Sequence, residues 1–247
     1  MTTHALEVSH LTKSFGGLPV TQDISLVIPQ GERRLILGPN GAGKTTLFNL
    51  ITGDLRSDSG SITLFGENVT RLRSDQRTQR GLARTFQIIT LFGKDTVEHN
   101  IVLSLMGRSK LRWCAWQKLR LQDEFRARTH AALALVGMAA AADTPLGALS
   151  YGEKRRVEIA MAMVQEPRLL LLDEPLAGLS QAERIAIRDL LMQIPRETTV
   201  VMIEHDMDVA LEFADRITLL HYGKVLVEGT RAEVVAHPKT REVYLGQ

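Results

Sequence analysis

Two stretches of the sequence contain the residue types that bind phosphate. The first, GPNGAGKT, has the spacing G-x-x-x-x-G-K-[ST], with Gly38, Gly43, Lys44 and Thr45 at the defining positions. In such a loop the glycines let backbone N–H groups surround phosphates, the lysine reaches the β and γ phosphates, and the hydroxyl can ligate Mg²⁺. A glycine-rich turn that binds nothing is the alternative, but a strand-like run before the loop and a helix-like run after it favour phosphate binding.

The second stretch is LSYGEKRRVEIAMAMVQEP, residues 149–167. Ser150 and Glu153 stand three apart just ahead of an apolar run, which is the spacing of a capping box at the start of a helix. A helix N-terminus with free N–H groups and a glycine beside it, here Gly152, can also bind phosphate. The chain therefore has two candidate phosphate-binding sites about a hundred residues apart in sequence.

Two carboxylates, Asp173 and Glu174, follow the apolar run RLLLLD. Ligands gather at the carboxyl ends of parallel strands, and Gly38 ends another such run. Asp173 can therefore hold Mg²⁺ through water, and Glu174 can orient or deprotonate an attacking water. Surface carboxylates that cap the next helix are the alternative, which the nearby phosphate loop makes less favourable.

Three further side chains have both a functional and an ordinary interpretation. His205 follows the run TTVVMIE at the same sheet edge, where it could contact a γ phosphate, but it could equally be a loop or core residue. Gln87 follows GLARTF and could simply be a polar residue at the end of a strand. Phe15, in KSFGG, could belong to the core or stack on adenine, which is worth roughly 1–3 kcal/mol by analogy with base stacking.

The elements around these residues indicate an α/β fold. The runs RRLILG, RLLLLD and TTVVMIE read as buried parallel strands, and a helical pattern follows each of them. Residues 6–32 alternate as antiparallel strands do, ITLLHYGKVLVEG reads as a hairpin turning at Tyr222 and Gly223, and residues 88–166 are almost entirely helical in character. We therefore expect one domain over residues 1–247, with a small N-terminal β sheet and an inserted helical subdomain.

Composition excludes several classes of protein. The 247 residues are 44% hydrophobic and 23% charged, with a net charge of +2 that is too small to indicate nucleic acid. The single cysteine, Cys114, rules out an internal disulfide and fits a reducing compartment. The N-terminus lacks a signal-peptide pattern, and the longest apolar run has 12 residues where a membrane helix needs about 20. We expect any membrane role to act through a partner.

Four elements in this order identify a family: the phosphate loop, a glutamine after a strand, LSYGE, and LLLLDEP followed by a histidine. The sequence resembles the ATP-binding subunit of ABC transporters along essentially its whole length. In that family the LSYGE loop is the signature motif, which presses onto the ATP held by the P-loop of a second chain. The resemblance thus implies why two phosphate loops are present: two chains pack head to tail around two ATP molecules.

The resemblance assigns roles motif by motif. It implies that Glu174 is the catalytic glutamate, His205 the switch histidine, and Gln87 the residue that couples the site to membrane subunits. Mg²⁺ would be held by Thr45, Gln87 and Asp173. The residues that would bind ATP are Phe15 on adenine, the Walker A loop Gly38, Pro39, Asn40, Gly41, Ala42, Gly43, Lys44, Thr45 and Thr46, and, on the partner's ATP, Ser150, Gly152 and Glu153.

Departures from the common motifs point to one branch of the family. Tyr151 replaces the middle glycine of LSGGQ, and Glu153 replaces its glutamine. Ser180 in the D-loop AGLS stands where many members carry aspartate, which puts the usual contact across the dimer in doubt. GLARTFQ, YGEKRRVEIA, AGLS and EVYLG resemble the branch that serves branched-chain and hydrophobic amino acid importers, and TVEHNI resembles its TVLENV, with His99 in place of glutamate. Urea importers and some lipopolysaccharide export ATPases share parts of these motifs.

The resemblance implies an ATPase that energises solute uptake from the cytoplasmic face of the inner (plasma) membrane. Its partners would be a second ATPase chain, identical or related, polytopic permease subunits and, indirectly, an external solute-binding protein, with no nucleic acid. The amino acid importer branch typically pairs two different ATPases. The alternatives are a lipopolysaccharide-type exporter subunit and a soluble ABC ATPase that acts on DNA or ribosomes. The solute is not indicated, because the ATPase subunit does not touch it.

Two segments near the helical region have open interpretations. IITLF, residues 88–92, is either core or, by family likeness, part of a groove for a cytoplasmic helix of the permease. Residues 107–120 interleave Arg and Lys with Trp113 and Trp116. This segment could be a solvated amphipathic insert, could contact membrane subunits or anionic headgroups, or could bind nucleic acid.

Overall fold

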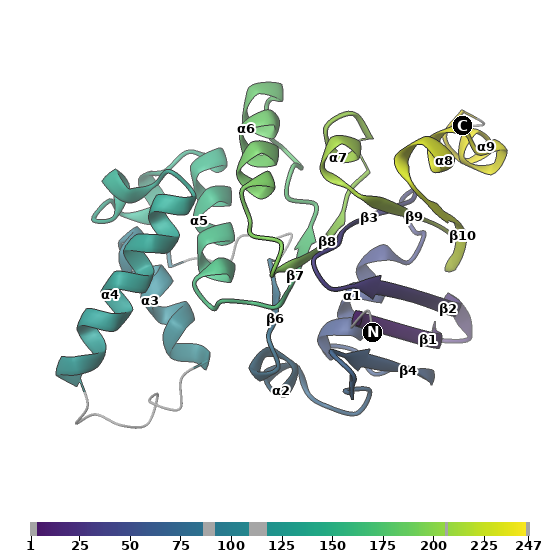
Figure 1. The fold of residues 1–247 in the computed structure, drawn as a ribbon, viewed down its shortest axis with the longest axis horizontal. Coiled ribbons are helices and arrows are strands. Elements are labelled where there is room, and N and C mark those ends of the chain that lie inside the picture. The colour runs from purple at the N-terminus through teal and green to yellow at the C-terminus, as the bar shows by residue number, and fades with distance from the viewer. Residues whose placement is uncertain (1–3, 86–91, 109–117, 206, 246–247) are drawn as a thin grey trace.

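The structure is a computed structural model that describes residues 4–85, 92–108, 118–205 and 207–245. Two sheets lie side by side, and helices cover the central one, with helices α3, α4 and α5 gathered at one end (Figure 1). No helix among the described residues is long and apolar enough to cross a membrane.

The central sheet has six strands in the order β10-β9-β3-β8-β7-β6. Strands β9, β3, β8, β7 and β6 are parallel, and β10 pairs with β9 as an antiparallel hairpin. Every residue of β3, β7 and β8 is buried, as expected of parallel strands covered on both faces. The strands are β3 (Arg33–Leu37), β6 (Leu82–Arg84), β7 (Leu169–Asp173), β8 (Thr199–Ile203), β9 (Arg216–His221) and β10 (Lys224–Gly229).

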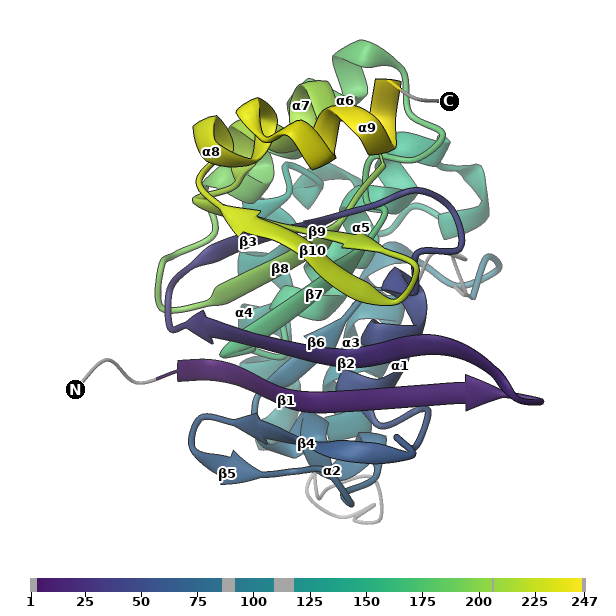
Figure 2. The same cartoon turned by 90° about the vertical axis from the view of Figure 1, so that its right-hand side faces the viewer.

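The second sheet is antiparallel, with the order β2-β1-β4-β5. Strands β1 and β2 are joined at Gly16 and Gly17, which both have positive φ, and β2 lies beside β10 (Figure 2). The strands are β1 (His4–Phe15), β2 (Leu18–Pro29), β4 (Ser59–Leu64) and β5 (Glu67–Asn68). The expected N-terminal β sheet is therefore present.

The helices of the described chain form two groups. Around the central sheet lie α1 (Lys44–Thr52), α2 (Ser74–Gln79), α6 (Gln181–Met192), α7 (Met207–Phe213), α8 (Arg231–Ala236) and α9 (Pro238–Leu245). The inserted region contains α3 (Val97–Arg108), α4 (Lys118–Leu135), α5 (Tyr151–Met163) and short 3₁₀ turns at Ala139–Ala141 and Leu146–Ala148. In its described part the only β pairing is one isolated bridge between Thr96 and Pro145.

Alternation along the central strands creates two hydrophobic cores. Leu35 and Leu37 of β3 point into the core shared with α3, α5 and α6, whereas Ile36 points into the core shared with α1 and the small sheet. Leu170 and Leu171 of β7 divide in the same way. Because successive side chains of a strand face opposite ways, one continuous apolar run supplies both layers.

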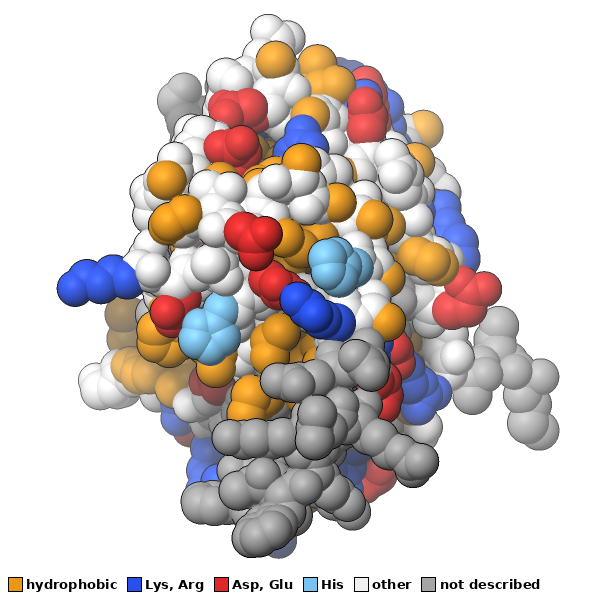
Figure 3. All heavy atoms as spheres, turned by 90° about the vertical axis from the view of Figure 1, so that its left-hand side faces the viewer, with side chains coloured by type: hydrophobic (Ala, Val, Ile, Leu, Met, Phe, Trp, Pro, Cys, Tyr) orange, Lys and Arg blue, Asp and Glu red, His pale blue; other side chains and the backbone are white. Residues whose placement is uncertain are grey.

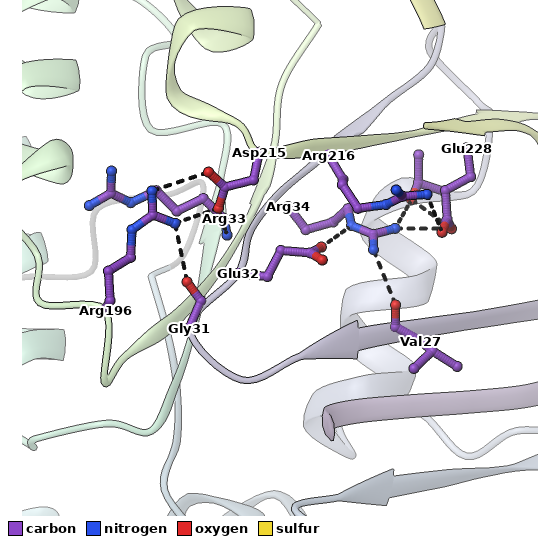
Figure 4. Close-up of polar contacts among 10 residues, drawn as sticks. Val27, Gly31, Glu32, Arg33, Arg34, Arg196, Asp215, Arg216 and Glu228 are labelled. Atoms are coloured by element: carbon purple, nitrogen blue, oxygen red, sulfur yellow. Dashed lines mark hydrogen bonds and ion pairs between the residues drawn. The ribbon is translucent and has the colours of Figure 1, made fainter. Parts of the chain in front are cut away.

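A charged cluster joins the two sheets at the N-terminal end of β3 (Figure 4). The buried Arg34 pairs with Glu32 at 2.5 Å and with Glu228 of β10 at 2.9 Å, and it donates to the carbonyl of Val27 in β2 at 3.1 Å. One guanidinium therefore connects β3, β10 and β2. Paired and hydrogen-bonded in this way, a buried charge is tolerated.

Candidate functional site

The loop between β3 and α1 is packed so closely at two of its glycines, Gly38 and Gly43, that neither has room for a side chain. A Cβ on Gly38 would lie 2.3 Å from the carbonyl oxygen of Leu220, and one on Gly43 would lie 2.7 Å from that of Val20. Gly43 also has a φ of 97°, in the left-handed region that glycine favours. No side chain caps the N-terminus of α1, so the first N–H groups of this helix can meet an anion.

Lys44 is folded over this loop. Its Nζ donates to the carbonyl oxygens of Gly38 at 2.6 Å and Pro39 at 3.1 Å. Burial lowers the pKa of Lys44, although the nearby carboxylates Glu174, Asp173 and Glu204 act in the opposite direction. The lysine and these carboxylates therefore face one another at the carboxyl edge of the sheet, as the sequence predicts for the first two. Asn40, Gly41 and Thr45 are exposed at the same loop.

Asp173, at the end of β7, has a partner that sequence reasoning missed. Its Oδ2 accepts from Nη2 of Arg84 at 2.6 Å, and both side chains are buried. Arg84 also donates to Oδ1 of Asn49 in α1 at 2.6 Å. The other oxygen of Asp173, Oδ1, is buried and has no hydrogen-bond partner among the described residues. The sequence feature that could have indicated this pair is the arginine in the short strand GLARTF, which lies next to the strand that ends in Asp173.

Glu174 has an unusual backbone. Its φ is 47°, which non-glycine residues adopt rarely and which is often found at functional sites. Its N–H donates to the carbonyl of Ile203 at 3.0 Å, and its own carbonyl accepts from the N–H of Ala177 at 3.2 Å. His205 Nδ1 lies 3.8 Å from Glu174 Oε1. The structure thus brings these two predicted residues together.

Glu204 was not expected in the site. It is buried beside His205, with its Oε2 at 4.0 Å from His205 Nδ1. Its Oε1 accepts from the backbone N–H of Leu176 at 2.8 Å, so it supports the turn after β7. It is the last residue of the run TTVVMIE, where a charged residue directly after a buried strand was the available signal.

The second phosphate-site candidate forms the predicted capping box at the start of α5. Ser150 Oγ accepts from the N–H of Glu153 at 3.3 Å, and Glu153 Oε2 accepts from the N–H of Ser150 at 2.8 Å. The hydrogen bonds that the Ser150 N–H and hydroxyl donate to this carboxylate hold the pKa of Glu153 below its usual value. Ser180 of the AGLS segment forms an equivalent box with Glu183 at the start of α6.

Comparison with known proteins decides the family. The family described as "ABC transporter" matches residues 21–177. The chain is 35% identical over 256 residues to the high-affinity branched-chain amino acid transport ATP-binding protein LivG of Salmonella typhimurium, covering all of both chains. It is also 35% identical over 254 residues to BraF of Pseudomonas aeruginosa, which has the same description, again over both whole chains. The chain belongs to the ABC transporter family.

Solved structures of ABC transporter cassettes have the same fold as this ABC ATPase. An ATP-binding cassette of an ABC transporter in its ADP conformation superimposes with a TM-score of 0.89 at 28% identity, covering all of both chains. A dimeric cassette bound to ADP and Pi gives a TM-score of 0.78 at 26% identity, over 92% of this chain and 98% of the other. The predicted P-loop α/β core with a β sheet and a helical insertion is therefore confirmed, and this ABC ATPase binds and hydrolyses ATP.

The donors around Asp173 fit a hard cation. The buried Oδ1 of Asp173, which no described residue bonds, is a ready ligand, and Thr45 supplies an exposed hydroxyl next to Lys44 in the sequence. The described residues contain no group of three or more His, Cys, Asp or Glu side chains placed to hold a metal by themselves. Nucleotide phosphates and water would complete the shell, as Mg²⁺ prefers in nucleotide sites.

Some predicted residues of the ABC ATPase are placed differently or lie outside the described chain. Phe15, at the end of β1, is 47% exposed, so its interpretation as a core aromatic is wrong, and Lys13 Nζ lies over its ring, 5.6 Å from the ring centre. Gln87 lies outside the described residues, as do residues 88–91 of IITLF and both tryptophans of the basic segment. Phe92, the last residue of IITLF, is 62% exposed.

A buried acid in α5 predicts a pH effect on stability. Glu158 pairs with Arg155 at 2.7 Å, and burial raises its pKa to about 7 despite that cation. The folded state therefore holds a proton that the unfolded state releases at about pH 4.3, so this group makes stability fall as pH rises from there to about 7. In Glu158→Gln this component is absent. Thermal unfolding from pH 5 to 8 should show a flatter profile for the variant, and parallel profiles would contradict the assignment.

Proposed function

We propose that this ABC ATPase energises an importer for branched-chain or other amino acids from the cytoplasmic face of the plasma membrane. The observation that carries the proposal is the match of the whole chain, end to end, to two branched-chain amino acid transport ATP-binding proteins. Tyr151 in the signature loop supports the same branch. The permease subunits would cross the membrane, and this chain would supply the ATPase.

The site residues divide the work of hydrolysis. Phe15 stacks on adenine, and the uncapped N–H groups of α1 bind the phosphates. Lys44 turns from the Gly38 and Pro39 carbonyls to the β and γ phosphates. Glu174 orients the attacking water and accepts its proton, while His205 contacts the γ phosphate. Thr45, Gln87 and Asp173 would hold Mg²⁺, which neutralises charge on the phosphates.

A second chain completes the site. Ser150 and Gly152 lie at the N-terminus of α5, where the helix dipole favours an anion, so each signature loop would cover the ATP bound by the other chain. Glu153 would lie at the same ATP, while its Oε2 still accepts the hydrogen bond from the Ser150 N–H. Hydrolysis removes the γ phosphate that both chains contact, and the difference in affinity for the two nucleotide states shifts the balance from closed to open.

The end of the molecule that carries α3, α4 and α5 would face the permease. Figure 3 shows hydrophobic side chains interspersed with acidic, basic and histidine side chains on this face. Phe92, just before α3, is exposed, and its backbone N–H and carbonyl are both held by the side chain of Asn100 in α3. A rigidly held, exposed aromatic residue suits a contact with a cytoplasmic helix of a membrane subunit.

Purification of the tagged chain from gently solubilised membranes tests the importer proposal. We expect mass spectrometry to identify polytopic permease subunits and a second ABC ATPase chain. In a transport assay, we expect amino acid uptake by the complex to increase when ATP is supplied. Ribosomal or DNA-associated partners, or components of lipopolysaccharide export, would contradict the proposal and leave the ATPase assignment intact.

A point variant tests the docking face in the same experiment. Phe92→Asp should reduce recovery of the permease about tenfold or more, because burying an unpaired carboxylate in an apolar contact costs on the order of 2–5 kcal/mol. Val235→Asp is the matched control, since Val235 is an exposed apolar residue on α8, 46% accessible. Equal recovery with both variants would place the permease contact elsewhere.

A further inference from the structure

The first residue of the signature helix packs on the D-loop of its own chain. Tyr151 begins α5, and a Cβ built on Gly178 would lie 3.3 Å from Cε1 of the Tyr151 ring. Gly178 also has a φ of 74°. The backbone of the AGLS segment therefore lies directly against the aromatic ring, and a Cβ at Gly178 would be in tight contact with it.

Arg155 lies one helical turn further along α5 and contacts the same region. Its guanidinium is buried, 5.9 Å from the centre of the Tyr151 ring, within the range of a cation–π contact. Its Nη1 pairs with Glu158 at 2.7 Å, and its Nη2 donates to the carbonyl oxygen of Glu174 at 3.5 Å. The arginine thus extends from the signature helix to the backbone of the catalytic glutamate.

The turn that Tyr151 and Arg155 contact runs from Glu174 to Gly178 and has a strained backbone at its start. Glu174 has its left-handed φ of 47°, and such a conformation persists only where surrounding contacts determine it. Arg155 contacts the first carbonyl of the turn, and Tyr151 packs on Gly178 at its far end. The two side chains of α5 therefore contact both ends of the segment that carries the Glu174 carboxylate.

We infer that Tyr151 and Arg155 are positioning residues for Glu174 and that they connect the two nucleotide sites of the dimer within one chain. This inference rests on the proposed composite site. Ser150, directly before Tyr151, would meet the partner's ATP, so a shift of α5 on that ATP moves the ring and guanidinium that hold Glu174. Hydrolysis at a chain's own site then depends on its signature loop being engaged at the other.

A contact of Tyr151 with the partner's ATP is the competing role, and the two roles predict different kinetics. If the ring positions Glu174, its loss lowers kcat while ATP binding and dimer closure persist. If the ring contacts nucleotide, its loss weakens ATP-dependent closure itself. Tyr151→Gly is suited to the comparison because glycine is the residue of the common signature motif, and Tyr151→Phe retains the ring as the conservative variant.

The experiment measures both variants in the assembled complex, alone and in the Glu174→Gln background. We expect Tyr151→Gly to lower kcat between about tenfold and a hundredfold, with KM for ATP unchanged, since small misplacements of a catalytic group cost that much. Tyr151→Phe should restore most of the rate. The double variant Tyr151→Gly/Glu174→Gln should close on ATP at the same concentration as Glu174→Gln.

Two results would overturn the inference: wild-type kcat in Tyr151→Gly, or loss of closure in the double variant while Glu174→Gln still closes. Failure of Glu174→Gln itself to close would instead contradict the proposed dimer. In that case the kcat ratio of Tyr151→Gly to Tyr151→Phe still decides whether the ring positions Glu174, because it is measured on turnover and not on closure.

Discussion

Lys44→Ala is expected to reduce ATP hydrolysis about a hundredfold to a thousandfold, as loss of one preorganised charge-stabilising donor does. The ammonium is already buried at the loop, held by the Gly38 and Pro39 carbonyls, so it needs little reorganisation to meet a triphosphate. No other lysine or arginine of the described chain is bonded to this loop's carbonyls, and alanine supplies no donor.

Steady-state release of phosphate measures this effect. Lys224→Ala is the matched control because Lys224 is an exposed lysine at the start of β10, next to Gly223, which bonds to the P-loop residue Ala42. The control should hydrolyse ATP at the wild-type rate, and both variants should melt near the wild-type temperature. Undiminished turnover in Lys44→Ala would mean that the P-loop is not the working site.

Glu174→Gln is expected to hold the ATPase in an ATP-bound dimer. The amide keeps the size of the carboxylate and can still orient water, but it cannot accept the proton of the attacking water, so hydrolysis should fall about a hundredfold or more. With the γ phosphate intact, both chains keep their contact to it. Size exclusion with ATP and Mg²⁺ should therefore show a dimer, formed with the second ATPase chain if the assembly contains one.

Glu166→Gln is the matched control for this variant. Glu166 also has a left-handed backbone, with a φ of 50°, but its side chain is exposed and paired with Arg128 away from the site. It should remain monomeric under the same conditions and turn over ATP normally. A Glu174→Gln protein that hydrolyses ATP at the wild-type rate would remove Glu174 from the catalytic role.

Much of the fold follows from local patterns in the sequence. The runs RRLIL, LLLLD and TVVMI each contain consecutive apolar residues without polar alternation, as expected of a strand buried on both faces, and all three are strands of the central sheet. The Ser150 capping box needs only two residues three apart, so it too can be read locally. The P-loop, the sheet edge and the approach of His205 to Glu174 follow from the strand ends.

The rest depends on contacts between segments that are far apart in sequence. Arg84 and Asp173 pair only because β6 lies beside β7, and no local pattern predicts that order. Tyr151 meets Gly178 because α5 and the turn after β7 converge in three dimensions. Phe15 alternates like a core residue, but the hairpin ends beside it and leaves the ring exposed. In each of these cases the outcome depends on which segments lie next to one another in three dimensions.

A structure of the Glu174→Gln protein with ATP and Mg²⁺, in its dimeric assembly, tests the central claim most directly. The predicted result places each γ phosphate within hydrogen-bond distance of Lys44 from one chain and of a signature serine from the other, with Ser150 Oγ turned from Glu153 toward the phosphate. ATP that contacts a single chain, with Ser150 still bonded only within its capping box, would contradict the account.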